Sequence, residues 1–205
     1  MSICTLNVKD HLYKIDDERV PSVTQILADL SIFSRLDPAV IAAAAEDGRL
    51  VHRAVELFNR GDLDEDSLHA SLVGYVTAWK RFVHDFQFHA ILIEQIVWSD
   101  RWKFAGTLDV YGSWKPLRLR RAALVDVKSG LKDLCHGPQT AAYLEAGRER
   151  NTVTRHAVDR VVVRLGINGF YEVDEYADPA DWSYFQAALH VYRFQERAGL
   201  RVTNG

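Results

Sequence analysis

Asp126 and Lys128 stand two residues apart at the end of an apolar run, residues 122–125. In an extended strand, side chains two residues apart point to the same face, so the carboxylate and the ammonium group would lie side by side while Val127 faces the core. A hard oxygen ligand beside a cation suits metal-assisted cleavage of a phosphodiester. An ion pair at a strand edge explains this pair equally well in isolation.

Side chains of related chemistry recur at other positions of the chain. His52 and Glu56 lie four residues apart in a predicted helix and therefore share one of its faces. The same holds for Gln139 and Tyr143 in a later helix, and Asp109 follows a Gly-Thr-Leu sequence in a predicted strand. Each has an ordinary explanation: a helix-surface pair, a solvated glutamine beside a core aromatic, or an aspartate that caps a turn. Their joint presence would need several separate coincidences, so we predict a shared site.

Hydrophobic periodicity defines the elements that must hold these side chains. Ser22 has Gln25 three residues later, the spacing of a capping box, which predicts a helix that begins there. Asp37 and Pro38 suit the N-cap and first position of the next helix. The later helices are predicted at 38–59, 65–88, 137–150 and 179–197, and the strands at 11–15, 19–20, 91–98, 103–114, 122–128, 158–165 and 169–173. This order predicts an α/β fold with a central mixed β-sheet flanked by helices.

Length and composition are typical of one globular domain. The 205 residues are 48% hydrophobic and 26% charged, and we expect 1–88 to form an N-terminal hairpin and helices and 89–205 the core sheet with its helices. The sequence lacks an apolar stretch that could cross a membrane and the layout of a secretory signal. Cys4 and Cys135 are isolated, which argues against a disulfide framework and a zinc or iron–sulfur site. A cytoplasmic protein without membrane contact is expected.

The formal net charge of −3 argues against a protein that coats nucleic acid through bulk charge. Contacts to DNA would come from local basic patches. Arg101, Trp102 and Lys103 lie at a predicted turn between strands, where an aromatic ring flanked by cations suits a single strand, although Trp102 also fits hairpin packing. A second patch, in a strand connection expected near the edge of the active site, comprises Lys115, Arg118, Arg120 and Arg121. A third patch follows the 137–150 helix and comprises Arg148, Arg150 and Arg155. Such runs are often solvated faces.

The candidate residues have an order found in one group of nucleases. They are Gly48, His52, Glu56, Glu94, Gly106-Thr107-Leu108-Asp109, Asp126-Val127-Lys128-Ser129-Gly130, Gln139 and Tyr143. The pattern resembles the RecB-like branch of the PD-(D/E)XK nuclease superfamily. Residues 19–27 also look like the opening of phage-type exonucleases and of the mitochondrial genome maintenance exonuclease. The resemblance implies a restriction-endonuclease-like core with an N-terminal helical elaboration. It implies no iron–sulfur cluster, because the spaced cysteines of cluster-bearing relatives are absent.

The resemblance also implies a metal centre. Asp109 and Asp126 look like the two metal-binding carboxylates of the family. His52 and the backbone carbonyl of Val127 look like further ligands of Mg²⁺ or Mn²⁺; one imidazole among oxygen ligands suits manganese at least as well as magnesium. Lys128 looks like the catalytic lysine that positions the attacking water and stabilises developing charge.

Four other residues take supporting parts in this comparison. Gln139 and Tyr143 resemble a helix pair of the catalytic site that orients the strand and the active-site lysine. Glu56 and Glu94 are expected behind the ligands, as groups that support the metal centre.

The sequence therefore predicts a metal-dependent deoxyribonuclease, an exonuclease on linear DNA ends, single-stranded ends among them, in recombination or repair. Its expected partner is DNA, with a recombinase or a single-strand-binding protein as a further candidate. Two alternatives stay open: a structure-specific or flap endonuclease on the same fold, and a nuclease-like domain that binds nucleic acid or a protein without cutting.

Overall fold

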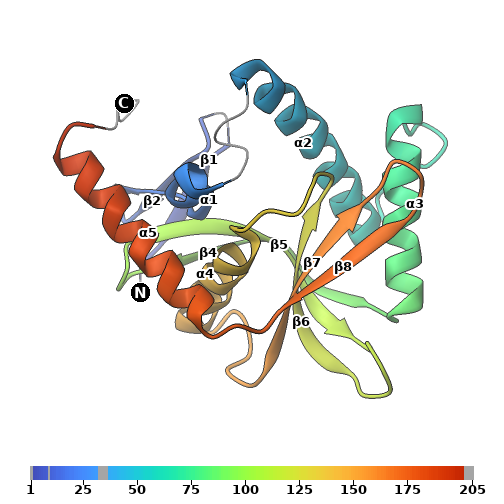
Figure 1. The fold of residues 1–205 in the computed structure, drawn as a ribbon. Coiled ribbons are helices and arrows are strands. Elements are labelled where there is room, and N and C mark those ends of the chain that lie inside the picture. The colour runs from blue at the N-terminus through green and yellow to red at the C-terminus, as the bar shows by residue number, and fades with distance from the viewer. Residues whose placement is uncertain (1, 9, 32–36, 201–205) are drawn as a thin grey trace.

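An α/β arrangement of two sheets flanked by helices is seen in the computed structural model, which describes residues 2–8, 10–31 and 37–200 (Figure 1). The larger sheet has the strand order β4-β5-β6-β7-β8 and is mixed, because β6 and β7 run parallel while the other neighbours run antiparallel. Its strands are β4 (His89–Ser99), β5 (Phe104–Trp114), β6 (Arg121–Lys128), β7 (Val158–Leu165) and β8 (Tyr171–Tyr176). The predicted α/β class with a central mixed sheet is confirmed.

The smaller sheet is antiparallel, with the order β1-β2-β3. It consists of β1 (Cys4–Asn7), β2 (Leu12–Ile15) and β3 (Glu18–Val20). The helices are α1 (Val23–Leu27), the short 3₁₀ helix η1 (Ala28–Leu30), α2 (Pro38–Arg60), α3 (Ala70–Asp85), α4 (His136–Glu149) and α5 (Ala180–Arg197). None of the helices in the described part of the chain is long and apolar enough to cross a membrane.

Most predicted bounds hold within two residues, but those of α3 and β8 do not, and one strand was not predicted. Helices α2, α4 and α5 begin and end within one residue of the prediction. Helix α3 begins at Ala70 and not at residue 65. In the preceding turn the Asp64 carboxylate accepts a hydrogen bond from Asp66 N, and the His69 ring caps the helix by accepting one from Ser71 N. Strand β8 begins at Tyr171, since Gly169 adopts φ +80° in the turn before it. Strand β1 was not predicted; it pairs with β2.

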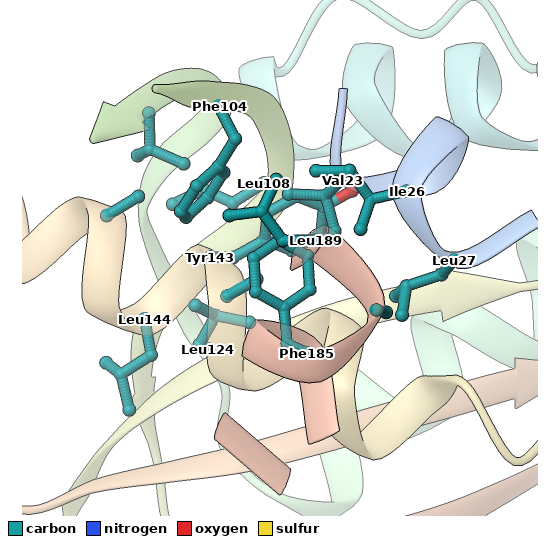
Figure 2. Packing of buried hydrophobic residues seen from close by; sticks show 14 of the residues in the cluster. Val23, Ile26, Leu27, Phe104, Leu108, Leu124, Tyr143, Leu144, Phe185 and Leu189 are labelled. Atoms are coloured by element: carbon teal, nitrogen blue, oxygen red, sulfur yellow. The ribbon is translucent and has the colours of Figure 1, made fainter. Parts of the chain in front are cut away.

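Two hydrophobic clusters lie on opposite faces of the large sheet. One joins the sheet to α1, α4 and α5, and Figure 2 shows Leu108 and Leu124 of the sheet meeting Tyr143 of α4 and Phe185 of α5. The other joins the sheet to α2 and α3, with Trp79 and Phe82 among its fully buried side chains. The sheet is thus covered on both faces, and polar side chains that lie inside it must find partners there.

Helix α1 is fixed at its start by the predicted capping box. Gln25 N donates to Ser22 Oγ at 3.1 Å, and Ser22 N donates to Gln25 Oε1 at 2.9 Å, which confirms the prediction. Ser22 also forms an isolated parallel bridge with Ala105 of β5. The cap therefore attaches α1 to the strand that carries Asp109.

Candidate metal centre

Three side chains from separate elements offer ligand atoms to one point. They are His52 of α2, Glu94 of β4 and Asp109 of β5, whose ligand atoms all lie within 4.8 Å of one another. The His52 Nδ1 atom is 3.4 Å from Asp109 Oδ1. An imidazole and two carboxylates are ligands that Mn²⁺ and Mg²⁺ accept, so this group is suited to a divalent cation.

Asp109 is held where β5 and β6 stop pairing. The backbone register of the two strands runs from Trp114 opposite Arg121 to Val110 opposite Val125. One residue further, the Asp109 side chain replaces the backbone as acceptor: Val127 N donates to Asp109 Oδ2 at 2.6 Å. The sheet itself therefore fixes this carboxylate, and its other oxygen stays directed toward His52.

Glu94 reaches the centre through an unusual backbone conformation. It lies between Ile93, which pairs with Val110, and Gln95, which pairs with Leu108, so it stands opposite Asp109. Its φ of +50° is in the left-handed region, which a glutamate inside a strand rarely occupies. Strain of this kind is concentrated at functional sites, where the surrounding structure holds it.

Behind this group, Asp126 and Lys128 form the ion pair that their spacing predicted. Lys128 Nζ lies 2.7 Å from Asp126 Oδ2. From α4, Gln139 Nε2 donates to Asp126 Oδ1 at 3.3 Å and to the Tyr143 hydroxyl at 3.1 Å. The helix pair thus contacts Asp126 directly, and it reaches the lysine through that carboxylate.

The structure places Asp126 differently from the expected ligand set. Among the described residues it lies outside the group that converges within 4.8 Å, and Glu94, expected behind the ligands, lies inside it. Asp126 is 1% exposed, and both of its oxygens face Lys128 or Gln139. Its role as a direct ligand stays a prediction, and its observed contacts suit a group that fixes Lys128.

Val127, whose backbone carbonyl is the predicted further ligand, lies beside Asp109, and its role as a ligand stays a prediction. The N–H and C=O of one strand residue face the same neighbouring strand, as the paired bonds of antiparallel ladders require. Since the Val127 N–H is directed to Asp109, its carbonyl faces the same space between β5 and β6. The Val127 side chain turns away into the cluster under α2 and α3, as predicted.

The centre holds more carboxylates than basic side chains. Burial, reinforced by the Asp109 carboxylate, raises the pKa of Glu94 to about 8. Burial and Asp109 also raise the pKa of Asp126 to about 6, although the Lys128 ammonium opposes this. A divalent cation would compensate three crowded carboxylates, so the donor set and its charge both fit one.

The charged forms of three groups are favoured in this environment. Burial alone would raise the pKa of Asp109, yet the neighbouring His52 holds it below the usual value. Burial alone would lower the pKa of Lys128, but Asp126 and Asp109 outweigh it and raise that pKa. For His52, burial is likewise outweighed by Asp109, and its pKa is raised.

The centre opens into a cleft of ≈ 950 Å³. His52, Glu94, Asp109 and Lys128 line it, together with Thr24 of α1 and other residues of α2 and the β1–β2 turn. The cleft is also lined by four residues that the sequence analysis did not single out: Val8, His11, Arg49 and Arg53. Their contribution depends on the small sheet and α2 facing each other, which no local pattern indicates.

Glu56, expected behind the ligands, is engaged elsewhere. Its carboxylate pairs with Arg53 at 2.6 Å and with Arg60 at 3.0 Å, both on its own helix. It lines the cleft but belongs to a row of ion pairs along α2. These pairs hold its pKa below the usual value although burial alone would raise it.

The predicted DNA-binding patches lie away from the centre. Lys115, Arg118, Arg120 and Arg121 were expected near the active-site edge, and that placement is wrong. Trp114 pairs with Arg121, five positions before Asp126, which puts the loop ~17 Å along β6 at the other end of the strand. Arg121 pairs with Asp159 at 2.5 Å and Arg120 bonds to Gln87 O at 3.1 Å. DNA contact by this loop stays a prediction.

The first predicted patch, Arg101 to Lys103, occupies the β4–β5 turn. The Arg101 guanidinium lies 5.2 Å from the centre of the Trp102 ring, and Lys103 Nζ is 3.8 Å from Glu18. Trp102 packs against the cluster under α4 and α5, as the hairpin-packing alternative supposed. The Arg101 side chain is exposed to solvent beside that ring.

No protein-family model and no curated protein matches this chain. The activity of the protein is therefore inferred from the metal centre and from the residue pattern of the sequence.

Proposed function

We propose that this protein is a metal-dependent nuclease that hydrolyses phosphodiester bonds in DNA. The observation that carries the proposal is the convergence of His52, Glu94 and Asp109 at the floor of an open cleft, with Lys128 beside them. A phosphate in this cleft would meet ligands for a divalent cation and a fixed ammonium group together.

Each residue has a part that follows from its contacts. His52, Glu94 and Asp109 would hold Mg²⁺ or Mn²⁺, with the Val127 carbonyl as a further oxygen donor. Such a cation, when bound, polarises the phosphate and acidifies a water molecule. Lys128, held by Asp126 at 2.7 Å and 23% exposed, faces the cleft and offsets negative charge that develops on the phosphoryl oxygens. Gln139 keeps Asp126, and so Lys128, in place.

The finer parts of the proposal come from the sequence resemblance. They are membership of the RecB-like PD-(D/E)XK branch, exonuclease action on linear DNA ends, a part in recombination or repair, and a cytoplasmic location. A recombinase or single-strand-binding partner belongs to the same set. The restriction-endonuclease-like description of the core is likewise proposed on this basis, with the mixed sheet in its support.

A digestion series tests the proposal. Linear single-stranded DNA, linear duplex, closed circular DNA and RNA are incubated with purified protein in Mg²⁺, Mn²⁺ or EDTA, beside Asp109→Asn as the matched inactive control. Metal-dependent loss of the linear DNAs alone supports the exonuclease. Nicked circles would assign the endonuclease instead. Absence of any metal-dependent product would leave a binding module and refute the nuclease.

A further inference from the structure

A second cavity, of ≈ 690 Å³, lies apart from the metal centre. It forms where the β4–β5 turn meets the last turns of α4 and the start of α5. None of its lining residues is shared with the cleft of the metal centre. Its floor is aromatic and its rim is basic, and both features suit the same kind of ligand.

The floor is aromatic. The Trp102 and Trp182 rings meet at right angles with their centroids 5.9 Å apart, and Trp182 also packs on Phe104 at 6.3 Å. Both indoles are only partly buried. Flat, partly exposed indole surface is a stacking platform for a planar ring, and such stacking accepts any nucleobase.

The rim carries two arginines that form no ion pair with another described residue. Arg101 lies against the Trp102 ring, and Arg155 bonds to the side-chain amide of Asn151 at 3.0 Å. Neither forms an ion pair with an acid among the described residues. A third rim arginine, Arg148, is paired with Glu145 at 2.8 Å. Arg101 and Arg155 are therefore available to an anionic ligand.

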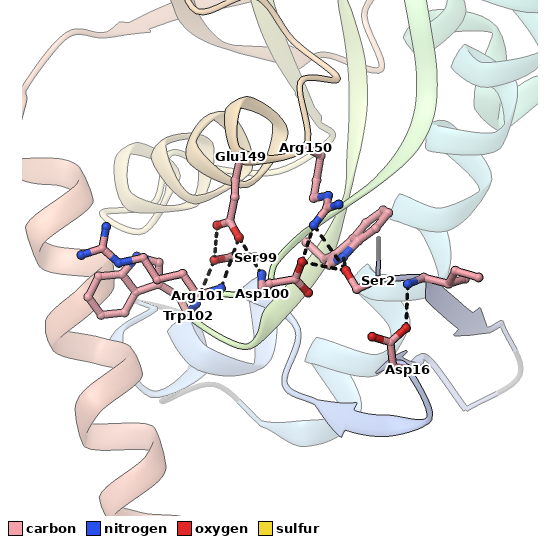
Figure 3. Close-up of polar contacts among 10 residues, drawn as sticks. Ser2, Asp16, Ser99, Asp100, Arg101, Trp102, Glu149 and Arg150 are labelled. Atoms are coloured by element: carbon pink, nitrogen blue, oxygen red, sulfur yellow. Dashed lines mark hydrogen bonds and ion pairs between the residues drawn. The ribbon is translucent and has the colours of Figure 1, made fainter.

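Glu149, the second acidic residue that lines the cavity, holds the β4–β5 turn in place. Glu149 accepts hydrogen bonds from Ser99 Oγ at 2.5 Å, from Asp100 N at 2.8 Å and from Arg101 N at 3.2 Å (Figure 3). Its carboxylate oxygens are thus engaged by the Ser99 hydroxyl and by two backbone N–H groups. The same bonds fix the turn that presents Arg101, so the cavity is organised before a ligand arrives.

We infer that this cavity binds a nucleotide unit of single-stranded nucleic acid, with the base on the indoles and the phosphate on Arg101 and Arg155. The choice of nucleic acid rests on the proposed nuclease function. Phe104 precedes Asp109 by five residues on β5, a separation of ~17 Å along the strand. The cavity would hold a strand several nucleotides away from the bond that is cut. An acidic peptide would satisfy the arginines but leave the indole surface uncovered.

The test is oligonucleotide binding in EDTA, where no cleavage occurs. Fluorescence anisotropy follows a labelled oligothymidylate about a dozen nucleotides long, a length within single-strand site sizes. Arg101→Gln/Arg155→Gln is compared with Lys80→Gln/Arg197→Gln, which removes the same charge from exposed positions elsewhere. Thymidine monophosphate and polyglutamate serve as competitors, and circular dichroism checks the fold. Quenching of indole fluorescence, with Trp182→Phe as its control, is a second readout.

The expected result is binding at least tenfold weaker in the Arg101/Arg155 variant, with a salt slope smaller by about 0.7, corresponding to one phosphate that is no longer neutralised. The control double variant should bind like the wild type. Equal binding by the two double variants, or absence of wild-type binding, overturns the inference. Equally tight binding of the free mononucleotide, or displacement by polyglutamate, also overturns it. Digestion by the wild type tests the nuclease separately, so either proposal can fail alone.

Discussion

Glu94 stands directly opposite Asp109 across the β4–β5 ladder, and it does so with a φ of +50°. This brings two carboxylates together in a largely buried position next to His52. Burial and the proximity of Asp109 raise the pKa of Glu94 to about 8. An unfavourable backbone conformation and an unfavourable charge pair at the same residue are compatible with the cation proposed to bind both carboxylates.

Replacing Glu94 with glutamine should therefore weaken metal binding. The substitution keeps the shape of the side chain and removes the charge, so we expect the dissociation constant for Mn²⁺ to rise roughly 10–100-fold. Isothermal titration calorimetry measures it. Glu56→Gln is the matched control, because that carboxylate lines the same cleft but pairs with Arg53 and Arg60. A similar loss in both variants, or none in Glu94→Gln, would remove Glu94 from the ligand set.

Lys128→Met should separate binding from cleavage. The ammonium group lies 2.7 Å from Asp126 and outside the group that converges on the metal, so metal and DNA affinity should persist. Loss of its positive charge should lower kcat by roughly 10²–10³-fold in single-turnover cleavage. Lys132→Met provides the comparison, since that lysine pairs with Asp174. Wild-type turnover in Lys128→Met would exclude Lys128 from the chemistry.

Local spacing was enough to predict the contacts within single elements. Asp126 and Lys128 share a strand face and form an ion pair, and Gln139 bonds to Tyr143 one helical turn away. These contacts depend only on the strand and helix periods. The capping box of Ser22 is predictable for the same reason.

Contacts between elements were harder to foresee. The position of Glu94 depends on the register of β4 against β5 and on a positive φ that no sequence pattern marks. The loop with Arg118 was misplaced because the antiparallel β5–β6 hairpin sends Trp114 and Arg121 away from Asp126. The cleft wall with His11 depends on how the small sheet faces α2. Such relationships are set by tertiary packing, which the alternation of residues does not encode.

Two glycines of the nuclease-like pattern should respond to alanine in opposite ways. A Cβ at Gly106 would lie 2.6 Å from Tyr143 Cε1, in a buried contact, so Gly106→Ala should lower the free energy of unfolding by about 1–3 kcal/mol. A Cβ at Gly48 would lie 3.7 Å from Ser129 Oγ, an ordinary contact, within α2. Gly48→Ala should raise it by about 0.5–1 kcal/mol. Urea unfolding measures both, and destabilisation by both would contradict the packing described here.

His136 is a buried histidine at the start of α4, 4% exposed, and its ring packs edge-on against Tyr176. Burial, with a smaller contribution from Lys128, lowers its pKa to about 4 in the folded protein. Asp133 and Asp174 act in the opposite direction but do not overcome burial. Folding thus keeps this imidazole neutral at a pH where it would be protonated in the unfolded chain.

This shift makes stability depend on pH in a defined window. The unfolded chain binds the proton near pH 6.5 and the folded protein only near 4, so the free energy of unfolding falls as the pH drops between these values. Allowing for partial solvation, the loss attributable to His136 is on the order of 2 kcal/mol. His136→Gln should lose less stability than the wild type between about pH 7 and pH 4.5 in urea unfolding. His156→Gln, at an exposed position, should follow the wild type. An unchanged pH dependence in His136→Gln would show that other groups account for it, because only this variant removes the buried imidazole.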